Sequence, residues 1–194
     1  KDKLGAELPT RRPCDSAVAP GLIAVGDAAG HVNPTNGAGI EGAAKAGHWA
    51  GREVVKAVSD GDVSEEAVWK YNKEVMSDFG KKYAAMDIYN IFGTAHDMDE
   101  LMDLISAIPG QKLADATTEG EASMSLWLKL KTLISTFGYW GTLWDIYKVS
   151  KKANEVKEHY ANYPASPEGF EDWKQERDSL MDEVYKITGA EPKY

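Results

Sequence analysis

Residues 21–51 read GLIAVGDAAGHVNPTNGAGIEGAAKAGHWAG, and this stretch decides the fold of the first part of the chain. Its residues 22–25 form a short apolar run closed by Gly26, which is typical of a strand buried on both faces of an α/β sheet. Asp27 follows at the carboxyl end of that strand, where open α/β sheets bind their ligands. A carboxylate there can accept hydrogen bonds from the hydroxyls of a sugar or ribityl chain. Because aspartate is also common in turns, a capping role for Asp27 is the alternative.

A second pattern follows in the same stretch, where Gly37, Gly39 and Gly42 match G-x-G-x-x-G. The dinucleotide fingerprint needs these glycines in a tight turn directly after the first strand, whereas here about a dozen residues separate the strand from the glycines. The pattern therefore does not predict a complete NAD site.

The glycines predict instead the start of a helix whose backbone is not covered by side chains. The first N–H groups of a helix lack partners and favour an anion or a polarised oxygen, such as a phosphate or a flavin carbonyl. Glycine costs about 1 kcal/mol per helix position relative to alanine, so a sheet or a cofactor is expected to approach closely. The small residues at helical spacing are Gly39, Gly42, Ala43, Ala46, Gly47, Ala50 and Gly51.

These residues carry a resemblance to a known family. The segments VGDAA at 25–29, Pro34 and GAGI at 37–40 resemble the second flavin-binding motif of the hydroxybenzoate-hydroxylase-like FAD proteins. The resemblance is closest to the geranylgeranyl reductase branch, which the preceding RRP at 11–13 also resembles. It is specific over residues 11–51 and rests on helical character beyond them.

The resemblance implies FAD as the cofactor. By position, Asp27 would bind the ribityl chain, and the backbone of residues 37–40 would approach the pyrophosphate and the isoalloxazine ring. The cofactor-binding residues that it implies are Gly26, Asp27, Ala28, Pro34, Gly37, Ala38, Gly39 and Ile40. No catalytic residue is assigned, because no side chain stands out as the proton donor.

The family's first strand and its glycine-rich turn should lie far upstream of this motif, yet only twenty residues precede Gly21 and the chain has no initiator Met. We therefore expect the C-terminal portion of a longer protein, inactive by itself because the N-terminal half of the FAD site is missing. The expected fold class is α/β, the end of a Rossmann-like FAD-binding domain over residues 1–60, followed by a mostly α-helical region over residues 61–194.

Composition bounds the function further. The 194 residues are 43% hydrophobic, which is ample for a core, and the net charge of −9 without a basic cluster argues against nucleic acid as a partner. Cys14 is the only cysteine, so no intrachain disulfide forms and a reducing cytoplasm fits. We interpret Cys14 as an ordinary thiol, with a place near the active site as the alternative. We interpret His31 as a surface loop histidine, with a position facing the flavin as the alternative. The scattered histidines predict no metal site.

Beyond residue 51 the pattern predicts helices. Ser64 is expected to cap a long helix that ends at Gly93, and shorter segments follow: a helix over 97–107, a loop over 111–120 and a helix over 126–137. A further helix is expected over 140–147, and Pro167 is expected to open a last helix that ends near Gly189.

The helices at 126–137 and 140–147 carry aromatic and aliphatic stripes. Ordinary helix packing explains such stripes. The alternatives are that they wall a tunnel for prenyl chains or lie against a membrane surface, although a strongly basic polar face is missing.

Together, the resemblance implies a reductase that saturates geranylgeranyl double bonds of lipids by hydride transfer from reduced flavin. The alternatives left open are a flavin monooxygenase or another FAD oxidoreductase, and a helical interaction module with an empty flavin motif. The expected partners are a prenylated lipid, the N-terminal half, and an electron donor that is a nicotinamide, ferredoxin or another carrier. The expected location is cytoplasmic, with peripheral membrane contact as an option.

Overall fold

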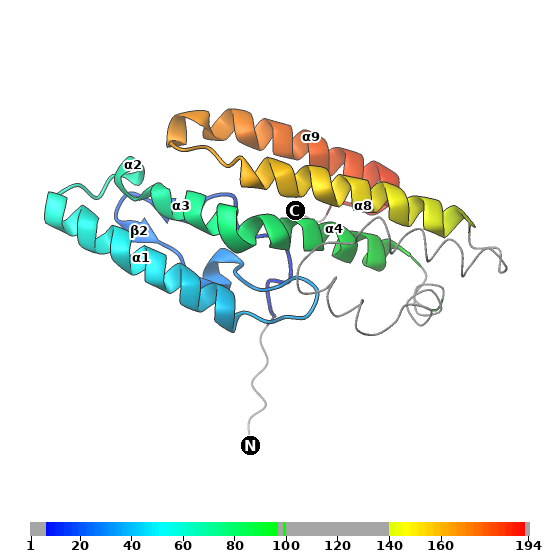
Figure 1. Ribbon diagram of the computed structural model, residues 1–194, viewed down its shortest axis with the longest axis horizontal. Coiled ribbons are helices and arrows are strands. Elements are labelled where there is room, and N and C mark those ends of the chain that lie inside the picture. The colour runs from blue at the N-terminus through cyan, green and yellow to red at the C-terminus, as the bar shows by residue number, and fades with distance from the viewer. Residues whose placement is uncertain (1–6, 97–98, 100–139, 193–194) are drawn as a thin grey trace, which may run out of the picture.

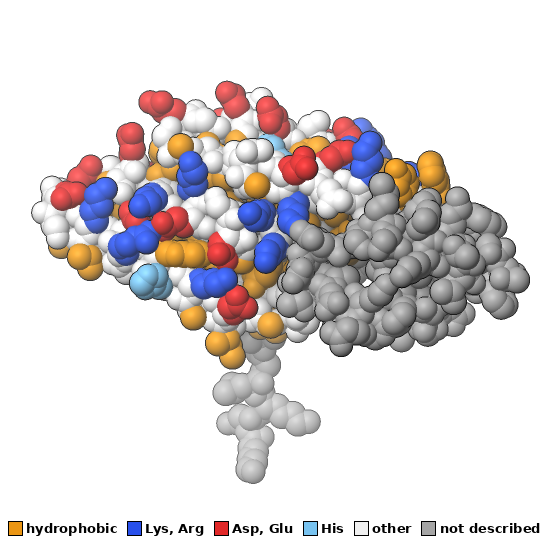
Figure 2. All heavy atoms as spheres, viewed as in Figure 1, with side chains coloured by type: hydrophobic (Ala, Val, Ile, Leu, Met, Phe, Trp, Pro, Cys, Tyr) orange, Lys and Arg blue, Asp and Glu red, His pale blue; other side chains and the backbone are white. Residues whose placement is uncertain are grey.

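A computed structural model describes residues 7–96, 99 and 140–192. The helices lie in layers (Figure 1). Helix α1 (Ile40–Asp60) is outermost on one side, α3 (Lys70–Val75) and α4 (Lys81–Ala95) lie in the middle, and α8 (Trp140–Ala161) and α9 (Phe170–Thr188) lie on the other side. Acidic and basic side chains are interspersed over the face drawn in Figure 2. The expected helical region is confirmed within the described residues.

The predicted buried strand is wrong. Strands β1 (Val18–Ala19) and β2 (Leu22–Ile23) pair antiparallel, with Val18 opposite Ile23 and Ala19 opposite Leu22. Leu22 is 57% exposed and Val25 is 40% exposed, because among the described residues β2 has one neighbouring strand and no layer over its outer face. A Rossmann-like sheet is therefore not confirmed in this part of the chain.

Asp27 lies in a turn of 3-10 helix, η1 (Gly26–Ala29), directly after the apolar run. The amide of Gly30 donates to the Asp27 carbonyl oxygen at 3.1 Å and closes the turn. Gly26 (φ +62°) and Gly30 (φ +68°) bracket it in the left-handed region, where a side chain would be strained. The backbone of Asp27 thus forms a turn, as one alternative predicts, while its side chain remains exposed.

Helix α1 buries one side made of small residues and leaves other small residues open. A Cβ at Gly42 would stand 2.8 Å from the carbonyl oxygen of His31, so a close approach does occur there, but the neighbour is the loop after η1 and not a sheet. A Cβ at Gly47 or Gly51 would meet no atom within 4 Å, so among the described residues nothing packs closely at these two positions. The buried residues of α1 are Gly42, Ala46, Ala50, Glu53 and Ala57.

The predicted helix after Ser64 is confirmed as a nearly continuous run of helix from residue 65 to residue 95. It consists of α2 (Glu65–Val68), α3, the π-helical turn η2 (Met76–Gly80) and α4. Ser64 Oγ accepts the Ala67 amide at 3.3 Å, as expected of the cap. The end at Gly93 is wrong by two residues, since α4 continues to Ala95.

The last two helices are also confirmed. Helix α8 contains the predicted 140–147 segment, and Pro167 opens a 3-10 turn, η3 (Pro167–Gly169), that leads into α9 and its end at Gly189. Trp144 is 56% exposed, so the aromatic stripe is not fully buried there. The predictions for 97–107, 111–120 and 126–137 fall outside the described residues.

An aromatic cluster fills the space between α2, α8 and α9. Trp69 stacks on Tyr163 with ring centroids 5.7 Å apart, and its Nε1 donates to the Pro164 carbonyl oxygen at 3.0 Å. Trp173 lies edge-on to both Tyr160 and Tyr163, at 5.1 and 4.8 Å. Large rings bury much apolar area, and the Trp69 Nε1 group is hydrogen-bonded, so this cluster anchors the helical layer.

Candidate functional site

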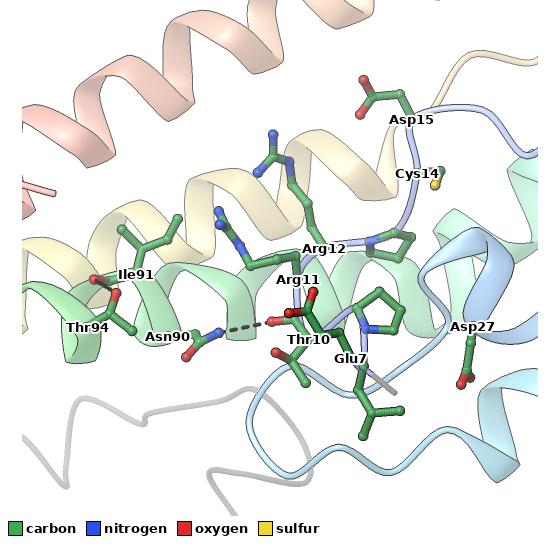
Figure 3. Close-up of a pocket in the computed structure, with 13 residues that line it drawn as sticks. Glu7, Thr10, Arg11, Arg12, Cys14, Asp15, Asp27, Asn90, Ile91 and Thr94 are labelled. Carbon is green, nitrogen blue, oxygen red and sulfur yellow. Dashed lines mark hydrogen bonds between the residues drawn. The ribbon is translucent and has the colours of Figure 1, made fainter. Parts of the chain in front are cut away.

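Asp27 lines a pocket of about 1030 Å³ that joins the flavin-like motif to the helical layer (Figure 3). One wall is the extended segment 7–15, and the other is the last part of α4, with Asn90, Ile91 and Thr94. The Asn90 side chain holds the two walls together, since its Nδ2 donates to the Thr10 carbonyl oxygen at 3.0 Å. The apolar residues that line the pocket are Leu8, Pro9, Pro13 and Ile91.

The eight residues predicted from the motif do not all reach this pocket. Asp27 lines it and the other seven do not. Gly26 and Pro34 are buried, Gly37 and Gly39 are half-buried, and Ala28, Ala38 and Ile40 are exposed. The contact that brings the motif together is between Asp27 and the start of α1: a Cβ at Gly39 would stand 3.3 Å from Asp27 Oδ1.

The loop between η1 and α1 is held by its own asparagines. The Asn33 amide donates to the Ala38 carbonyl oxygen, and the Gly37 amide donates to the Asn33 carbonyl oxygen, both at 2.9 Å. Asn36 Oδ1 accepts the Ala38 amide at 2.9 Å, and Gly37 has φ +73°. These bonds fix the loop up to the start of α1 at Ile40. The residue at the cap position is Gly39, so no side chain there accepts a hydrogen bond from the first amides of α1.

His31 is not the surface residue that the sequence suggested. It is 1% exposed and packs edge-on against Phe79, with ring centroids 5.2 Å apart. Its Nδ1 accepts the Gly26 amide at 3.1 Å, and its own amide donates to the Gly26 carbonyl oxygen at 3.0 Å. Burial lowers the pKa of His31 to about 4, so the neutral ring carries its proton on Nε2. His31 therefore closes the turn that presents Asp27.

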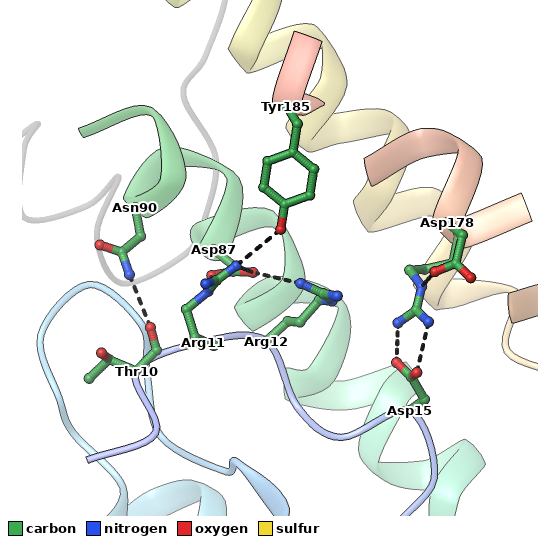
Figure 4. Close-up of polar contacts among 9 residues, drawn as sticks. Thr10, Arg11, Arg12, Asp15, Asp87, Asn90, Asp178 and Tyr185 are labelled. Atoms are coloured by element: carbon green, nitrogen blue, oxygen red, sulfur yellow. Dashed lines mark hydrogen bonds and ion pairs between the residues drawn. The ribbon is translucent and has the colours of Figure 1, made fainter. Parts of the chain in front are cut away.

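The RRP segment ties the pocket wall to α4 (Figure 4). Arg11 Nε lies 2.6 Å from Asp87 Oδ1, and Arg12 Nη1 lies 3.3 Å from Asp87 Oδ2. The Asp87 side chain is fully buried, so two guanidinium groups compensate one buried carboxylate. Sequence reasoning did not identify Asp87; the available signal was a single acid within the apolar run YAAMDI at 83–88.

A second ion pair fixes the part of the wall that carries Cys14. Arg177 from α9 contacts Asp15 with both terminal nitrogens, Nη2 donating to Oδ2 at 2.8 Å. Tyr163 OH donates to the Asp15 carbonyl oxygen at 2.7 Å. Partial desolvation and the neighbouring Asp15 raise the pKa of the Cys14 thiol. Cys14 is thus protonated at neutral pH, in line with its interpretation as an ordinary thiol.

Two further properties bear on the site. Within residues 7–96, 99 and 140–192, no three histidine, cysteine, aspartate or glutamate side chains gather closely enough to hold a metal ion. None of the helices in the described residues combines the length and the apolar composition needed to cross a membrane.

Comparison with known proteins identifies the relatives of the chain. No protein-family model matches it. It is 31% identical over 186 residues to a digeranylgeranylglycerophospholipid reductase of Sulfolobus acidocaldarius, a match that covers 95% of the chain. Its curated homologues are geranylgeranyl reductases. Reductases of the same name from Methanothrix thermoacetophila (32% identical over 127 residues) and Methanosphaera stadtmanae (33% over 106 residues) also match.

The resemblance to the geranylgeranyl reductases is thereby confirmed, and it extends well past residue 51. The match lies in the C-terminal part of the Sulfolobus reductase, and the chain spans 41% of that reductase's length. For the Methanothrix and Methanosphaera reductases, the matches cover 65% and 54% of the chain and 32% and 26% of the relatives.

Proposed function

We propose that this chain supplies the second flavin motif and the helical region of an FAD-dependent reductase that saturates geranylgeranyl double bonds of lipids. The observation that carries the proposal is the similarity to digeranylgeranylglycerophospholipid reductases along 95% of the chain. In this proposal the other half of the FAD site comes from the sequence that precedes the matched region in those relatives.

The residues at the motif fit a flavin. The Asp27 carboxylate is exposed beside the start of α1, which has no side-chain cap. Gly39 has no side chain to crowd this carboxylate, whereas a Cβ at that position would stand 3.3 Å from Asp27 Oδ1. A carboxylate at a helix start favours a hydroxyl donor such as a ribityl chain over a phosphate, because a second anion would be repelled. When bound, FAD would supply the hydride for an isolated alkene.

The residues of this chain then have three tasks. Asp27 accepts a charge-assisted hydrogen bond from a ribityl hydroxyl. The first amides of α1, which have no side-chain cap, donate to a polarised oxygen of the cofactor. The apolar wall formed by Leu8, Pro9, Pro13 and Ile91 holds a prenyl segment and excludes water from the alkene.

The volume of the pocket agrees with this use. About 1030 Å³ is at the upper end of the range of small-molecule sites, which is enough for a segment of an isoprenoid chain. The partners we propose are a prenylated lipid and an electron donor that is NADPH, ferredoxin or another carrier. We place the reaction in the cytoplasm, at the periphery of the membrane that holds the lipid.

The test of the flavin site is Asp27→Ala in a protein that joins this chain to the amino-terminal portion of the Sulfolobus reductase. We expect the flavin content per mole to fall at least about tenfold, because a charge-assisted hydrogen bond is lost. Absorbance of the released flavin measures this. Asp62→Ala is the matched control, since Asp62 is another exposed turn aspartate, accepting the Ser64 amide at 2.9 Å.

The same protein, incubated with a reductant and a geranylgeranyl lipid, should increase the mass of the lipid by one H₂ per saturated double bond. Flavin content that is unchanged in Asp27→Ala would refute the role of Asp27. A flavin-loaded wild type that leaves the lipid mass unchanged would refute the reductase proposal.

A further inference from the structure

Two buried polar atoms behind the pocket wall have no hydrogen-bond partner among the described residues: Arg12 Nε and Tyr160 OH. The rest of each side chain is held. Arg12 Nη1 lies 3.3 Å from Asp87 Oδ2, and the Tyr160 ring lies edge-on to Trp173. A buried donor that makes no hydrogen bond destabilises a fold, and nearly all such groups in proteins are bonded to the protein or to ordered water. Both atoms therefore need an acceptor.

The Tyr160 hydroxyl lies among charged groups. Tyr160 comes from the last turn of α8 and is fully buried. Burial raises the pKa of its hydroxyl to about 12, with the charges of Arg12 and Arg177 opposing the shift and that of Asp15 adding to it. Arg177 is occupied elsewhere, because its three nitrogens donate to Asp15 and Asp178. The hydroxyl therefore lies close to Arg12 and Arg177 without a bond to either.

Two groups of ion pairs flank this place. On one side, Arg12 shares the Asp87 carboxylate with Arg11. On the other side, Arg177 holds Asp15 with both terminal nitrogens. In Figure 4, Arg12 lies between Asp87 and Asp15. Charged groups from the extended segment, α4 and α9 thus lie on both sides of the two unbonded atoms.

The chemistry of the two atoms favours one shared acceptor. Arginine Nε can only donate a hydrogen bond, and a tyrosine hydroxyl can donate one. A water molecule can accept from both and donate its own hydrogens to the carboxylates of Asp15 or Asp87. Buried waters typically make about three such bonds to groups that the protein leaves unsatisfied. A halide ion fits less well, because it has no hydrogen to donate and two carboxylates would repel it.

We propose that one buried water molecule bridges Arg12 Nε and Tyr160 OH. This water joins the cluster of Arg11, Asp87 and Arg12 to the pair of Arg177 and Asp15. It is a site of the helical layer, distinct from the flavin and lipid contacts described under the proposed function.

The bridge has a consequence for the pocket wall. The amide of Cys14, two residues after Arg12, donates to the Ala29 carbonyl oxygen at 3.1 Å. The segment that the water ties to α8 on one side is therefore bonded on the other side to η1, the turn that carries Asp27. The water thus helps to hold the helical layer against the turn that presents Asp27.

Tyr160→Phe in the 194-residue chain removes the hydroxyl and keeps the ring. We expect the ratio of folded to unfolded chain to fall about fivefold, as for the loss of one ordinary hydrogen bond, and urea titration measures this. Tyr163→Phe is the matched control, because Tyr163 OH donates to the Asp15 carbonyl oxygen at 2.7 Å and loses that bond in any case. If Tyr160→Phe is as stable as the wild type or more stable, the hydroxyl has no partner and the proposal is overturned.

A second variant tests whether the two atoms share one water. Arg12→Lys keeps a positive charge opposite Asp87 and removes the Nε donor. Because both substitutions break the same bridge, the double variant should lose less than the product of the two single effects. Effects that simply multiply would mean two separate acceptors and would contradict the bridge.

A high-resolution crystal structure of the wild-type chain locates the acceptor directly. We expect an ordered water within hydrogen-bond distance of both Arg12 Nε and Tyr160 OH. A direct bond between the two atoms would overturn the proposal, and anomalous scattering at this place in crystals grown with bromide would replace the water with an anion. Neither flavin nor prenyl lipid enters these measurements, so their result is independent of the reductase assay.

Discussion

Helices α1 and α4 bury their surfaces in opposite ways. Helix α4 is covered on nearly every side by α8, α9 and the 7–15 segment, and it buries Tyr83, Met86, Ile88 and Phe92 together with Asp87. Helix α1 buries only small residues and Glu53, and it leaves three valines and Ile40 in water. Among the described residues, helix α4 is therefore covered by its neighbours, whereas α1 leaves one apolar face exposed.

The largest expected effect concerns the buried aromatic cluster of the helical layer. Trp69→Ala removes a side chain that is 1% exposed and stacked on Tyr163, so we expect the free energy of unfolding to fall by about 4 kcal/mol. Val58→Ala on the exposed face of α1 should change the free energy of unfolding by less than about 0.5 kcal/mol. Urea titration followed by circular dichroism measures both. Equal losses from the two variants would contradict the contrast between the helices.

The next test concerns the ion pairs that join the 7–15 segment to α4. Asp87→Asn leaves Arg11 and Arg12 without a buried countercharge, and we expect a loss of about 3 kcal/mol in the free energy of unfolding. Asp145→Asn breaks a partly exposed pair with Lys148 and should cost less than about 1 kcal/mol. If the two variants are equally stable, the Arg11–Asp87–Arg12 cluster does not fix the pocket wall.

The smallest effect concerns His31, which closes the turn at Asp27. Burial lowers the pKa of His31 to about 4, from about 6.5 in an unfolded chain. The unfolded chain therefore takes up a proton before the folded one, and the stability that depends on neutral His31 is lost as the pH falls from 6.5 toward 4. Between pH 7 and pH 5 we expect this group to cost about 2 kcal/mol.

His31→Asn keeps an acceptor near the position of Nδ1 and has no proton to gain, so its stability should depend less on pH over that interval. His31→Leu keeps the bulk without the acceptor, and amide exchange at Gly26 should then be faster than in His31→Asn. Chemical denaturation at several pH values and hydrogen exchange measure the two effects. The same pH dependence in wild type and His31→Asn would rule out His31 as its source.

The sequence predicted those elements whose cause is local. The cap at Ser64, the proline that opens the last helix and the glycine at its end each act within a few residues, and the structure confirms them. The burial of residues 22–25 was predicted wrongly, because a strand is buried by its neighbours and the described residues supply only β1.

The site residues that sequence reasoning missed depend on long-range contacts. Asp87 is 76 residues from Arg11 in the sequence. His31 is buried by rings from η2 and α3, and no sequence pattern near His31 predicts these contacts. Asp27 was identified because its position after a strand is itself a local signal. Its neighbour Gly39 was identified as part of a motif, and the contact between them is what the structure added.

The π-helical turn at Met76–Gly80 sets the rotational phase of everything that follows it in the long helix. A π turn holds one more residue than an α turn, so if the same residues were wound as a regular α-helix, α4 would be rotated by about 100° relative to α3. Asp87 would then turn away from Arg11 and Arg12, and Asn90 would turn away from Thr10. One residue of chain length, placed far from the pocket in sequence, keeps the pocket wall facing its partner.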